Sequence, residues 1–372
     1  MAKGRRRLSR RIPRRVIVSA VTGMVTLLLV AVAVTLTTMN RGHRTASNIA
    51  ARAPAALSSA VATSRPASPS PSPSKKKKKP APELLSVGCG PDPHRCGFPD
   101  ATNAGVPAGV SLSTVSAGSS GPGWSTDSQG NVEVSGDGAV FSGYSVHGTV
   151  TVTGDNAVIK DDAISNYGND IDGDGVNLTG NPSNVTIEHV NISSPYGTQG
   201  DMGVFAGIKD INGEAMGTRV LDSNIADAST GVQLYIGLIE GNYIHDVSPA
   251  EPDSHLNGTT SNGSTVPLTI RHNTVFNPNS QTDAISLFED FGVEANVDID
   301  DNLVAGGGYT IYGGQNSGGP QAYNIRITNN HFSNIYYSQC GYYGYIAAFD
   351  PSGPGNVWSG NVWDSTGESV SP

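Results

Sequence analysis

Short segments in which apolar and polar residues alternate follow one another from about residue 130 to the end of the chain. They are rich in Val, Ile and Thr, they run for four to seven residues, and Gly, Asn and Asp separate them. Alternation with a period of two is typical of β-strands, because successive side chains of a strand point to opposite faces of the sheet. No long segment of this region has the period of an amphipathic helix. The pattern therefore predicts an all-β region built of short strands.

One six-residue pattern recurs along this region: an apolar residue, two variable residues, Asn, one variable residue and a second apolar residue. Six copies have Asn224, Asn242, Asn273, Asn302, Asn330 and Asn361, and three earlier copies have Tyr144, Asp162 and Val190 at the same place. Asn tolerates the left-handed backbone conformation that a sharp corner between strands requires. Amides that stack in a pile of parallel strands can also hydrogen-bond to one another. We therefore expect nine turns with the Asn column at one corner.

A second set of positions recurs at steps of 26 to 28 residues, with one longer step at the end. Its members, each at the head of a short strand, are Val176, Val204, Val232, Thr259, Ile285, Ile311 and Ile346. Fixed periods of this length are typical of a solenoid in which each turn is one structural unit. The sequence therefore predicts a solenoid of strands over residues 131–372.

The repeat, as in residues 327–332 with the sequence ITNNHF, resembles that of the right-handed parallel β-helix proteins of the pectin-lyase-like superfamily. The resemblance covers about residues 130–366. The segment 348–358, AFDPSGPGNVW, is similar to the β-helix proteins secreted by high-GC Gram-positive bacteria. The resemblance implies an all-β fold, a right-handed parallel β-helix of about nine turns. It implies no single chemistry, because the superfamily includes lyases, hydrolases, epimerases and adhesins without catalytic activity.

The first 84 residues have a different character. Residues 1–15 are strongly basic, and residues 16–39 carry no charge and are long enough, at about 1.5 Å per residue, to cross a bilayer. The basic residues before the span predict a cytoplasmic tail and a transmembrane signal anchor. A cleaved signal peptide is the alternative, which would make the protein secreted. Residues 40–84, rich in Ala, Ser, Pro and Lys, predict a disordered linker, so the β-region is expected outside the cell membrane.

Charge and cysteine content narrow the set of partners. Residues 85–372 hold 6 basic and 31 acidic residues, and a net charge of −25 argues against nucleic-acid binding. Cys89 and Cys96 suit a small disulfide loop in an oxidising compartment, with two free thiols as the alternative, and Cys340 is expected to be buried. Residues 85–130, which include Trp124, are expected to cap the open N-terminal end of the solenoid. We expect a monomer.

The residues on either side of the second set are expected to point outward. Those before it are Gly175, Gly203, Gly231, Gly258, Ala284, Thr310 and Tyr345, and those after it are Asn177, Phe205, Gln233, Thr260, Ser286, Tyr312 and Ala347. Small residues flanked by amides, hydroxyls and aromatic rings would form a shallow groove for a sugar chain, with an ordinary solvated sheet face as the alternative. The candidate binding residues are Asn177, Gln233, Tyr235, Asn257, Thr260, Ser286 and Tyr312.

Acidic residues gather beside these strands. Asp170, Asp172 and Asp174 occupy alternate positions before the first of them, a spacing that can direct oxygen atoms at Ca²⁺. The Glu that usually follows such a loop is Asn181 here, so a solvated acidic turn is the alternative. Calcium is the one cofactor that the sequence suggests.

The segment 253–260, DSHLNGTT, is the most suggestive of catalysis. It is similar to a stretch that many relatives share, with His, one residue, Asp-Gly, an apolar residue and Gln, but it has Asn257 and Thr260 where the Asp and Gln would stand. His255 is the candidate general base, with Asp253 and Asp283 as candidate acids. A structural turn histidine is the alternative reading of His255.

Three functions follow from these candidates, all with a polysaccharide or cell-wall glycan as partner. A lyase-type enzyme that abstracts a proton next to a uronate carboxylate is favoured. A glycoside hydrolase that pairs Asp253 with Asp283 is the second, since residues on adjacent turns lie close to the separation of paired catalytic carboxylates. A glycan-binding or structural surface module without turnover is the third.

Overall fold

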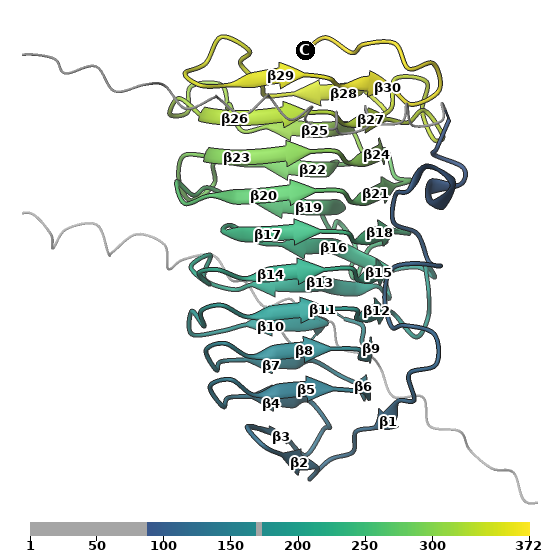
Figure 1. Ribbon diagram of the computed structural model, residues 1–372, viewed down its shortest axis with the longest axis vertical. Helices are drawn as coiled ribbons and strands as arrows, with labels where there is room; N and C mark the ends of the chain where they lie inside the picture. The colour runs from purple at the N-terminus through teal and green to yellow at the C-terminus, as the bar shows by residue number, and fades with distance from the viewer. Residues whose placement is uncertain (1–87, 169–172) are drawn as a thin grey trace, which may run out of the picture. The chain divides into compact units, whose positions relative to one another are not determined.

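The computed structural model describes residues 88–168 and 173–372, and it shows a parallel β-solenoid of nine turns (Figure 1). Each turn contributes one strand to each of three sheets, here called A, B and C. The described part also contains one short 3₁₀ helix, η1 (Pro93–Cys96). No helix in this part is long and apolar enough to cross a bilayer. The predicted basic tail, anchor and linker over 1–84 lie outside the described residues.

The strands of each sheet follow one another along the solenoid axis. Sheet A contains β1 (Ser113–Thr114), β6 (Tyr144–His147), β9 (Ala163–Ser165), β12 (Asn191–Ser193), β15 (Asn224–Ala226), β18 (Tyr243–His245), β21 (Thr274–Asn277), β24 (Leu303–Gly306), β27 (His331–Phe332) and β30 (Val362–Trp363). Sheet B contains β2 (Ser120–Gly121), β3 (Trp124–Thr126), β4 (Val132–Val134), β7 (Val150–Val152), β10 (Val176–Leu178), β13 (Val204–Asp210), β16 (Ala228–Gln233), β19 (Asn257–Ser261), β22 (Asp283–Leu287), β25 (Tyr309–Gly313) and β28 (Gly344–Ala347). Sheet C contains β5 (Val140–Ser142), β8 (Val158–Lys160), β11 (Thr186–Glu188), β14 (Arg219–Leu221), β17 (Gly237–Glu240), β20 (Leu268–Arg271), β23 (Ala295–Asp300), β26 (Tyr323–Thr328) and β29 (Val357–Ser359).

The core consists of stacked apolar side chains inside the three sheets. In sheet C, for example, an unbroken column of fully buried residues consists of Phe141, Ile159, Ile187, Val220, Ile239, Ile270, Ile299 and Ile327. Each such side chain stabilises the fold by about 1.5 to 3 kcal/mol relative to exposure. Like residues therefore form columns, as the repeat predicted.

Amides at the corner between sheets C and A form the predicted ladder. The Oδ1 atoms of Asn273, Asn302, Asn330 and Asn361 each accept the backbone N–H and the side-chain amide of the Asn one turn earlier, at 2.9 to 3.0 Å. These buried amides also donate to backbone carbonyls, as Asn302 Nδ2 does to Ile270 O. The ladder thus satisfies the polar backbone groups of the corner, which no water reaches.

The prediction that the ladder Asn itself takes the left-handed conformation was wrong. The left-handed residue at each corner is the one before it: Gly143, Asp161, His189, Asp222, Gly241, His272, Asp301, Asn329 and Gly360. Asn, Asp and Gly dominate this position because they tolerate positive φ. The ladder position is instead selected for an amide that both donates and accepts.

Two registers predicted from the repeat were also wrong. In the turn of β14 and β15, Val220 pairs with Ile239 and Ile225 pairs with Ile244, so Ser223 holds the ladder position rather than Asn224. Ser223 makes the same kinds of hydrogen bond as a ladder Asn: its backbone N–H donates to Asn242 Oδ1, and its hydroxyl accepts from Val190 N. In sheet B the partner of Val176 is Ile208, four residues beyond Val204, because β13 is longer than its neighbours.

Both ends of the solenoid core are covered. At the N-terminal end, β2, β3 and β4 pair in antiparallel fashion, and Trp124 packs edge-on against Phe141 and Tyr144, with ring centroids 5.1 Å away in each case. At the other end, the C-terminal tail folds back so that Val370 is buried and accepts a hydrogen bond from Trp358 Nε1. The apolar columns therefore end without an exposed stack.

The segment 88–112, here called the strap, runs along the solenoid beside sheet A from the last turn to the first (Figure 1). Its middle is fixed by the N–H groups of Gly105 and Val106, which donate to Asp222 O and Asn191 Oδ1. The strap then leads into β1, which pairs with β6. Of the predicted cap over 85–130, residues 113–130 lie at the N-terminal end, and the strap lies along the side.

The upper part of the strap seals a second, smaller core on the outer face of sheet A. Cys89 and Cys96 form a disulfide, and Phe98 is fully buried next to them. These three side chains pack on residues of sheet A, namely Phe276, Leu303 and Ala305. Apolar residues on both faces of these strands explain why the alternation of the repeat weakens there.

Replacing the central ladder residue should destabilise the protein strongly. Asn302→Ala leaves the buried N–H of Asn273 without its acceptor and removes three amide donations, so we expect a loss of about 2 to 4 kcal/mol in the free energy of unfolding. Chemical unfolding followed by circular dichroism measures this loss. Asn212→Ala, which removes an exposed amide that donates to Asn181 Oδ1, should cost little and is the control. Equal losses in the two variants would contradict the ladder's role.

The acidic member of the ladder predicts a pH dependence of stability. Asp162 is fully buried and accepts from Tyr144 N and Lys160 N, yet burial outweighs these bonds and raises its pKa to about 8. Because the pKa is raised on folding, stability is lost as the pH rises from about 4 through 8. Asp162→Asn cannot ionise, so it should retain on the order of 4 kcal/mol more stability than the natural protein at pH 9 relative to pH 5. Unfolding at the two pH values tests this, and parallel losses would contradict it.

Candidate functional site

The small residues predicted to line an outward groove point into the solenoid instead. A Cβ placed on Gly175, Gly231 or Gly258, or on Gly207, which the register puts in the place predicted for Gly203, would lie 2.3 to 2.7 Å from a methyl group of the sheet A core residues Ile192, Ile225, Ile244 and Val275. Ala284 and Thr310, the next members of the row, are fully buried. The chain bends where sheet A leads into sheet B, so two successive residues face inward there. Small size at this position is therefore a packing requirement of the corner.

The true outward column of sheet B follows the inward residues by one position. Its members in register are Thr151, Asn177, Lys209, Gln233, Thr260, Ser286, Tyr312 and Ala347. Phe205 was predicted for this column because Val204 was taken as the inward residue of its strand, and Lys209 was therefore not predicted. Lys209 is one of only six basic residues in 85–372, and this rarity is the signal that could have identified it.

A cleft of about 250 Å³ opens on this face of sheet B. Its lining residues come from β13, β16 and the connection 246–256, and they are Phe205, Ala206, Lys209, Ser229, Thr230, Gln233, Glu251, Asp253, Ser254 and His255. Of the predicted residues, the cleft brings together the candidate base His255, the candidate acid Asp253 and the candidate binding residue Gln233. Glu251 and Lys209 join them without having been predicted.

The connection 246–256 holds the two catalytic candidates at the cleft rim. Hydrogen bonds between Glu251 and Ser254, in both directions, close a tight turn in which Asp253 has a left-handed φ of 68°. Leu256 N donates to Thr282 Oγ1 of the next turn, which fixes the chain directly after His255. Asp253 and His255 are both exposed. The turn thus presents an imidazole and a carboxylate to a ligand in the cleft.

The floor of the cleft carries a positioned cation and a positioned amide. Lys209 Nζ lies 4.7 Å from the centroid of the Phe205 ring, a distance typical of a cation–π interaction. Gln233 Nε2 donates to the Tyr235 hydroxyl, and Asn262 Nδ2 donates to the same oxygen. Tyr235 is nearly buried, so its part is to orient Gln233 rather than to face a ligand.

The other predicted binding residues do not line the cleft. Asn177 borders a separate hollow of about 330 Å³ near the first turns of sheet B. Asn257 is buried and donates to Thr230 Oγ1, so it supports the cleft wall from behind. Thr260 and Ser286 are also buried. Tyr312 is half-buried and stacks near Phe288, at a centroid distance of 5.3 Å.

Asp283, the third catalytic candidate, is fully buried away from the cleft lining. The connection 307–308 covers it, since a Cβ on Gly307 would lie 2.6 Å from the Asp283 Cα. Neither carboxylate oxygen meets a hydrogen-bond partner at close geometry among the described residues. Burial raises the pKa of this carboxyl well above its ordinary value, with Ser286 acting weakly against the rise. The structure therefore does not assemble Asp253 and Asp283 as an accessible carboxylate pair.

The calcium prediction stays a prediction. Asp170 and Asp172 lie outside the described residues. Asp174, directly before β10, is fully buried. A buried carboxylate at one end of the loop is compatible with a ligand role, but it does not by itself define a coordination shell.

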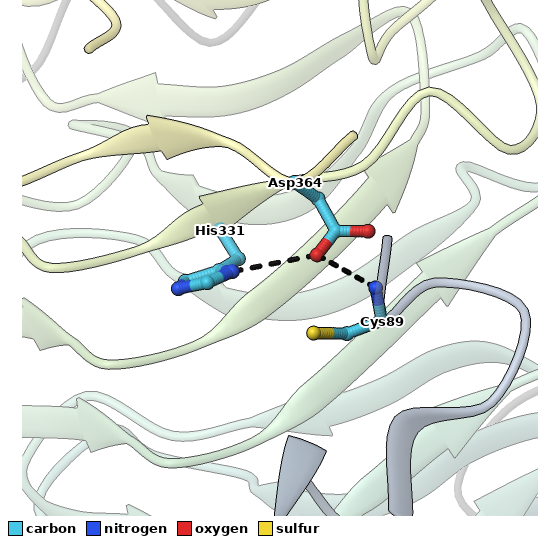
Figure 2. A group of neighbouring side chains, drawn as sticks. All are labelled: Cys89, His331 and Asp364. Atoms are coloured by element: carbon cyan, nitrogen blue, oxygen red, sulfur yellow. Dashed lines mark hydrogen bonds and ion pairs between the residues drawn. The ribbon is translucent and has the colours of Figure 1, made fainter. Parts of the chain in front are cut away.

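Cys89, His331 and Asp364 form a cluster of metal-ligand types whose ligand atoms lie within 4.8 Å of one another (Figure 2). The Cys89 sulfur is bonded to Cys96, so it offers no thiolate. The Asp364 carboxylate accepts the N–H groups of Cys89 and Gly90 at 3.0 and 2.8 Å and contacts His331 Nδ1 at 3.4 Å. Burial acts to raise the pKa of Asp364, but these hydrogen bonds outweigh it and lower the pKa. The cluster is a clasp that joins the strap to the last turn.

No protein-family model, no curated protein and no solved structure matches this chain. The geometry of the cleft therefore carries the functional argument alone.

Replacing the buried carboxyl group of Asp283 by an amide should not lower the stability of the protein at pH 8. Because the pKa of Asp283 is raised on folding, its ionisation costs stability as the pH rises above about 4. Asp283→Asn keeps the shape and cannot ionise, so its melting temperature at pH 8 should be equal to or above that of the natural protein. Asp253→Asn, at the exposed rim, should leave the melting temperature unchanged. An Asp283→Asn protein that is less stable than the natural protein at every pH would show that the fold requires the carboxyl group itself.

Proposed function

We propose that the protein is an extracellular polysaccharide-acting enzyme of lyase type, held at the cell membrane by residues 16–39. The observation that carries the proposal is the cleft on sheet B, which combines an exposed imidazole, a lysine ammonium group and an oriented amide. The proposal takes the solenoid to be right-handed, as crossover connections between parallel strands are, and similar to the pectin-lyase-like β-helix proteins. A monomer that binds no nucleic acid fits the acidic folded part.

The chemistry of β-elimination uses each of these groups. His255 would take the proton next to the uronate carboxylate, and the electron pair would form a carbon–carbon double bond as the glycosidic carbon–oxygen bond breaks. The leaving oxygen then takes a proton from solvent or from the imidazolium. Lys209 would neutralise the negative charge that builds on the carboxylate, the role for which a preorganised cation is most effective. Gln233 would hold a sugar hydroxyl.

The charges around the cleft limit the ligand. Glu251 and Asp253 line the same cleft as Lys209, so only the position next to Lys209 favours a carboxylate. A net charge of −25 over 85–372 repels a chain in which every sugar is a uronate. Calcium bound by residues 170–174 stays part of the proposal as a bridge to such a chain, and no step above depends on it.

A glycan-binding module without turnover is the second candidate. The observation in its favour is an exposed group of aromatic rings on the same sheet face, since Tyr342 and Tyr343 are 53% and 62% exposed. A hydrolase that uses Asp253 with Asp283 has less support, because Asp283 is sealed from the cleft.

Removing the base or the cation should abolish turnover without unfolding the protein. We expect His255→Gln to lower the rate by about 10²- to 10⁴-fold and Lys209→Gln by about 10²- to 10³-fold. The ultraviolet absorbance of the unsaturated uronate product measures the rate over a panel of uronate-containing polysaccharides, with and without Ca²⁺. Lys160→Gln is the control, because Lys160 lies on sheet C and pairs there with Glu188 at 2.9 Å.

Two results would overturn the lyase proposal. The first is absorbance that stays flat with every polysaccharide of the panel, which would favour the binding module. The second is an equal effect of Lys160→Gln and Lys209→Gln, which would show that charge alone, and not the cleft, sets the rate.

A further inference from the structure

Six aromatic rings form a continuous chain on the face of sheet B, three to four turns along from the cleft. We call this group the aromatic platform; in order of contact it contains Phe288, Tyr312, Tyr309, Tyr343, Tyr342 and Tyr337. Successive ring centroids are 4.8 to 5.8 Å apart. Tyr342 and Tyr343, the two residues directly before β28, are largely exposed, and the other four rings are partly exposed. A contiguous exposed aromatic surface on a soluble domain is typical of a binding site.

The loop that carries half of the platform is fixed in place. Residues 333–343 connect β27 to β28, and the N–H groups of Tyr342 and Tyr343 donate to Gly307 O and Gly308 O at 2.8 and 2.7 Å. Cys340 is fully buried beneath the loop, and its Sγ donates to Val304 O. The rings are therefore held before any ligand arrives, so that binding costs little side-chain entropy.

The chemistry of the platform selects an uncharged ligand. Among its phenol groups in the described part, only the Tyr337 hydroxyl has a hydrogen-bond acceptor, Pro278 O, so the others are available to sugar hydroxyls. No Lys or Arg contributes to the platform, and Glu289 and Asp290 follow directly after Phe288. Aromatic faces stack on the C–H faces of pyranose rings, whereas the neighbouring carboxylates repel an anionic sugar.

The platform and the cleft lie over the same sheet, sheet B. Lys209 in the cleft and Tyr312 in the platform occupy the same outward column of sheet B. Lys209 lies on β13 and Tyr312 on β25, and the strands β16, β19 and β22 lie between them. At about 4.8 Å per strand the two positions are about 19 Å apart. A glycan that follows the solenoid axis would reach both.

We infer that the aromatic platform binds the uncharged sugars of a long heteropolysaccharide in which the uronate at the cleft is flanked by neutral residues. The inference rests on the proposed function for the uronate, while the stacking of neutral sugars on the platform stands independently of turnover. The protein would accordingly bind long neutral chains and discriminate against homopolymers of uronate.

Affinity electrophoresis of the full chain through gels that contain one polysaccharide each tests the platform. The neutral probes are hydroxyethylcellulose, xyloglucan, xylan and mannan, and the anionic probe is polygalacturonate. We expect retardation by at least one neutral polysaccharide, and the double variant Tyr342→Ala with Tyr343→Ala should weaken that affinity at least tenfold. Tyr343→Phe, which keeps the ring, should retain most of it. Phe291→Ala is the matched control, since Phe291 is 79% exposed and stacks on no other ring of the described residues.

The outcomes separate this inference from the lyase proposal. Migration unaffected by every neutral polysaccharide, or equal weakening by Phe291→Ala, would overturn the platform. Retardation by polygalacturonate alone would overturn it as well. If His255→Gln and Lys209→Gln retain the neutral-glycan affinity while no polysaccharide gives an unsaturated product, the platform stands and the lyase proposal fails.

Discussion

The backbone polar groups at the corner between sheets C and A are the constraint on which the solenoid depends. A sharp corner removes these groups from the regular strand pairing, and no water reaches them, so each turn must find acceptors in the next. Stacked Asn side chains supply them, since one amide both accepts from the preceding turn and donates to a carbonyl. The same repetition keeps all nine turns in register, and with them the outward column of sheet B that carries the candidate site. Ser223 and Asp162 show that the position accepts other side chains with an oxygen atom: the Ser223 hydroxyl accepts from Val190 N and donates to Leu221 O, whereas the Asp162 carboxylate only accepts.

The sequence predicted the architecture well because the fold repeats. A misread position in one turn is corrected by the same pattern in the other turns, and nine turns of parallel strands follow from the period alone. Register within a single turn has no such support. Val204 was taken for Ile208 because β13 has an extra length of strand, and Asn224 was taken for Ser223 because a second Asn lies one residue away. In the site, His255, Asp253 and Gln233 line one cleft, whereas Asp283 is covered by the connection 307–308, whose course no repeat encodes, and Ser286 is buried as well. Local composition identified the polar residues, and only the three-dimensional packing decided which of them reach the surface.

The connections that lead from sheet A to sheet B differ widely in length. Asp227 alone joins β15 to β16, and residues 307–308 join β24 to β25, whereas the next connections span 246–256 and 333–343. Each long connection stands beside a short one, so it rises above the sheet and forms a wall: the first wall carries His255 and borders the cleft, and the second carries Tyr342 and Tyr343. The buried Cys340 holds the second wall in place, which explains a free cysteine without redox chemistry.

The strap determines where a pulling force on the preceding residues would reach the folded part of the chain. Because Gly88, Cys89 and Gly90 bond to Asp364, the polypeptide joins the solenoid at its last turn, although it begins winding at the first. Tension applied through the preceding residues would act first on the Asp364 clasp and on the packing of Phe98. The strap would bear this tension before the first strand of the solenoid does. Pulling on the preceding residues would therefore not begin by unwinding the turns one after another.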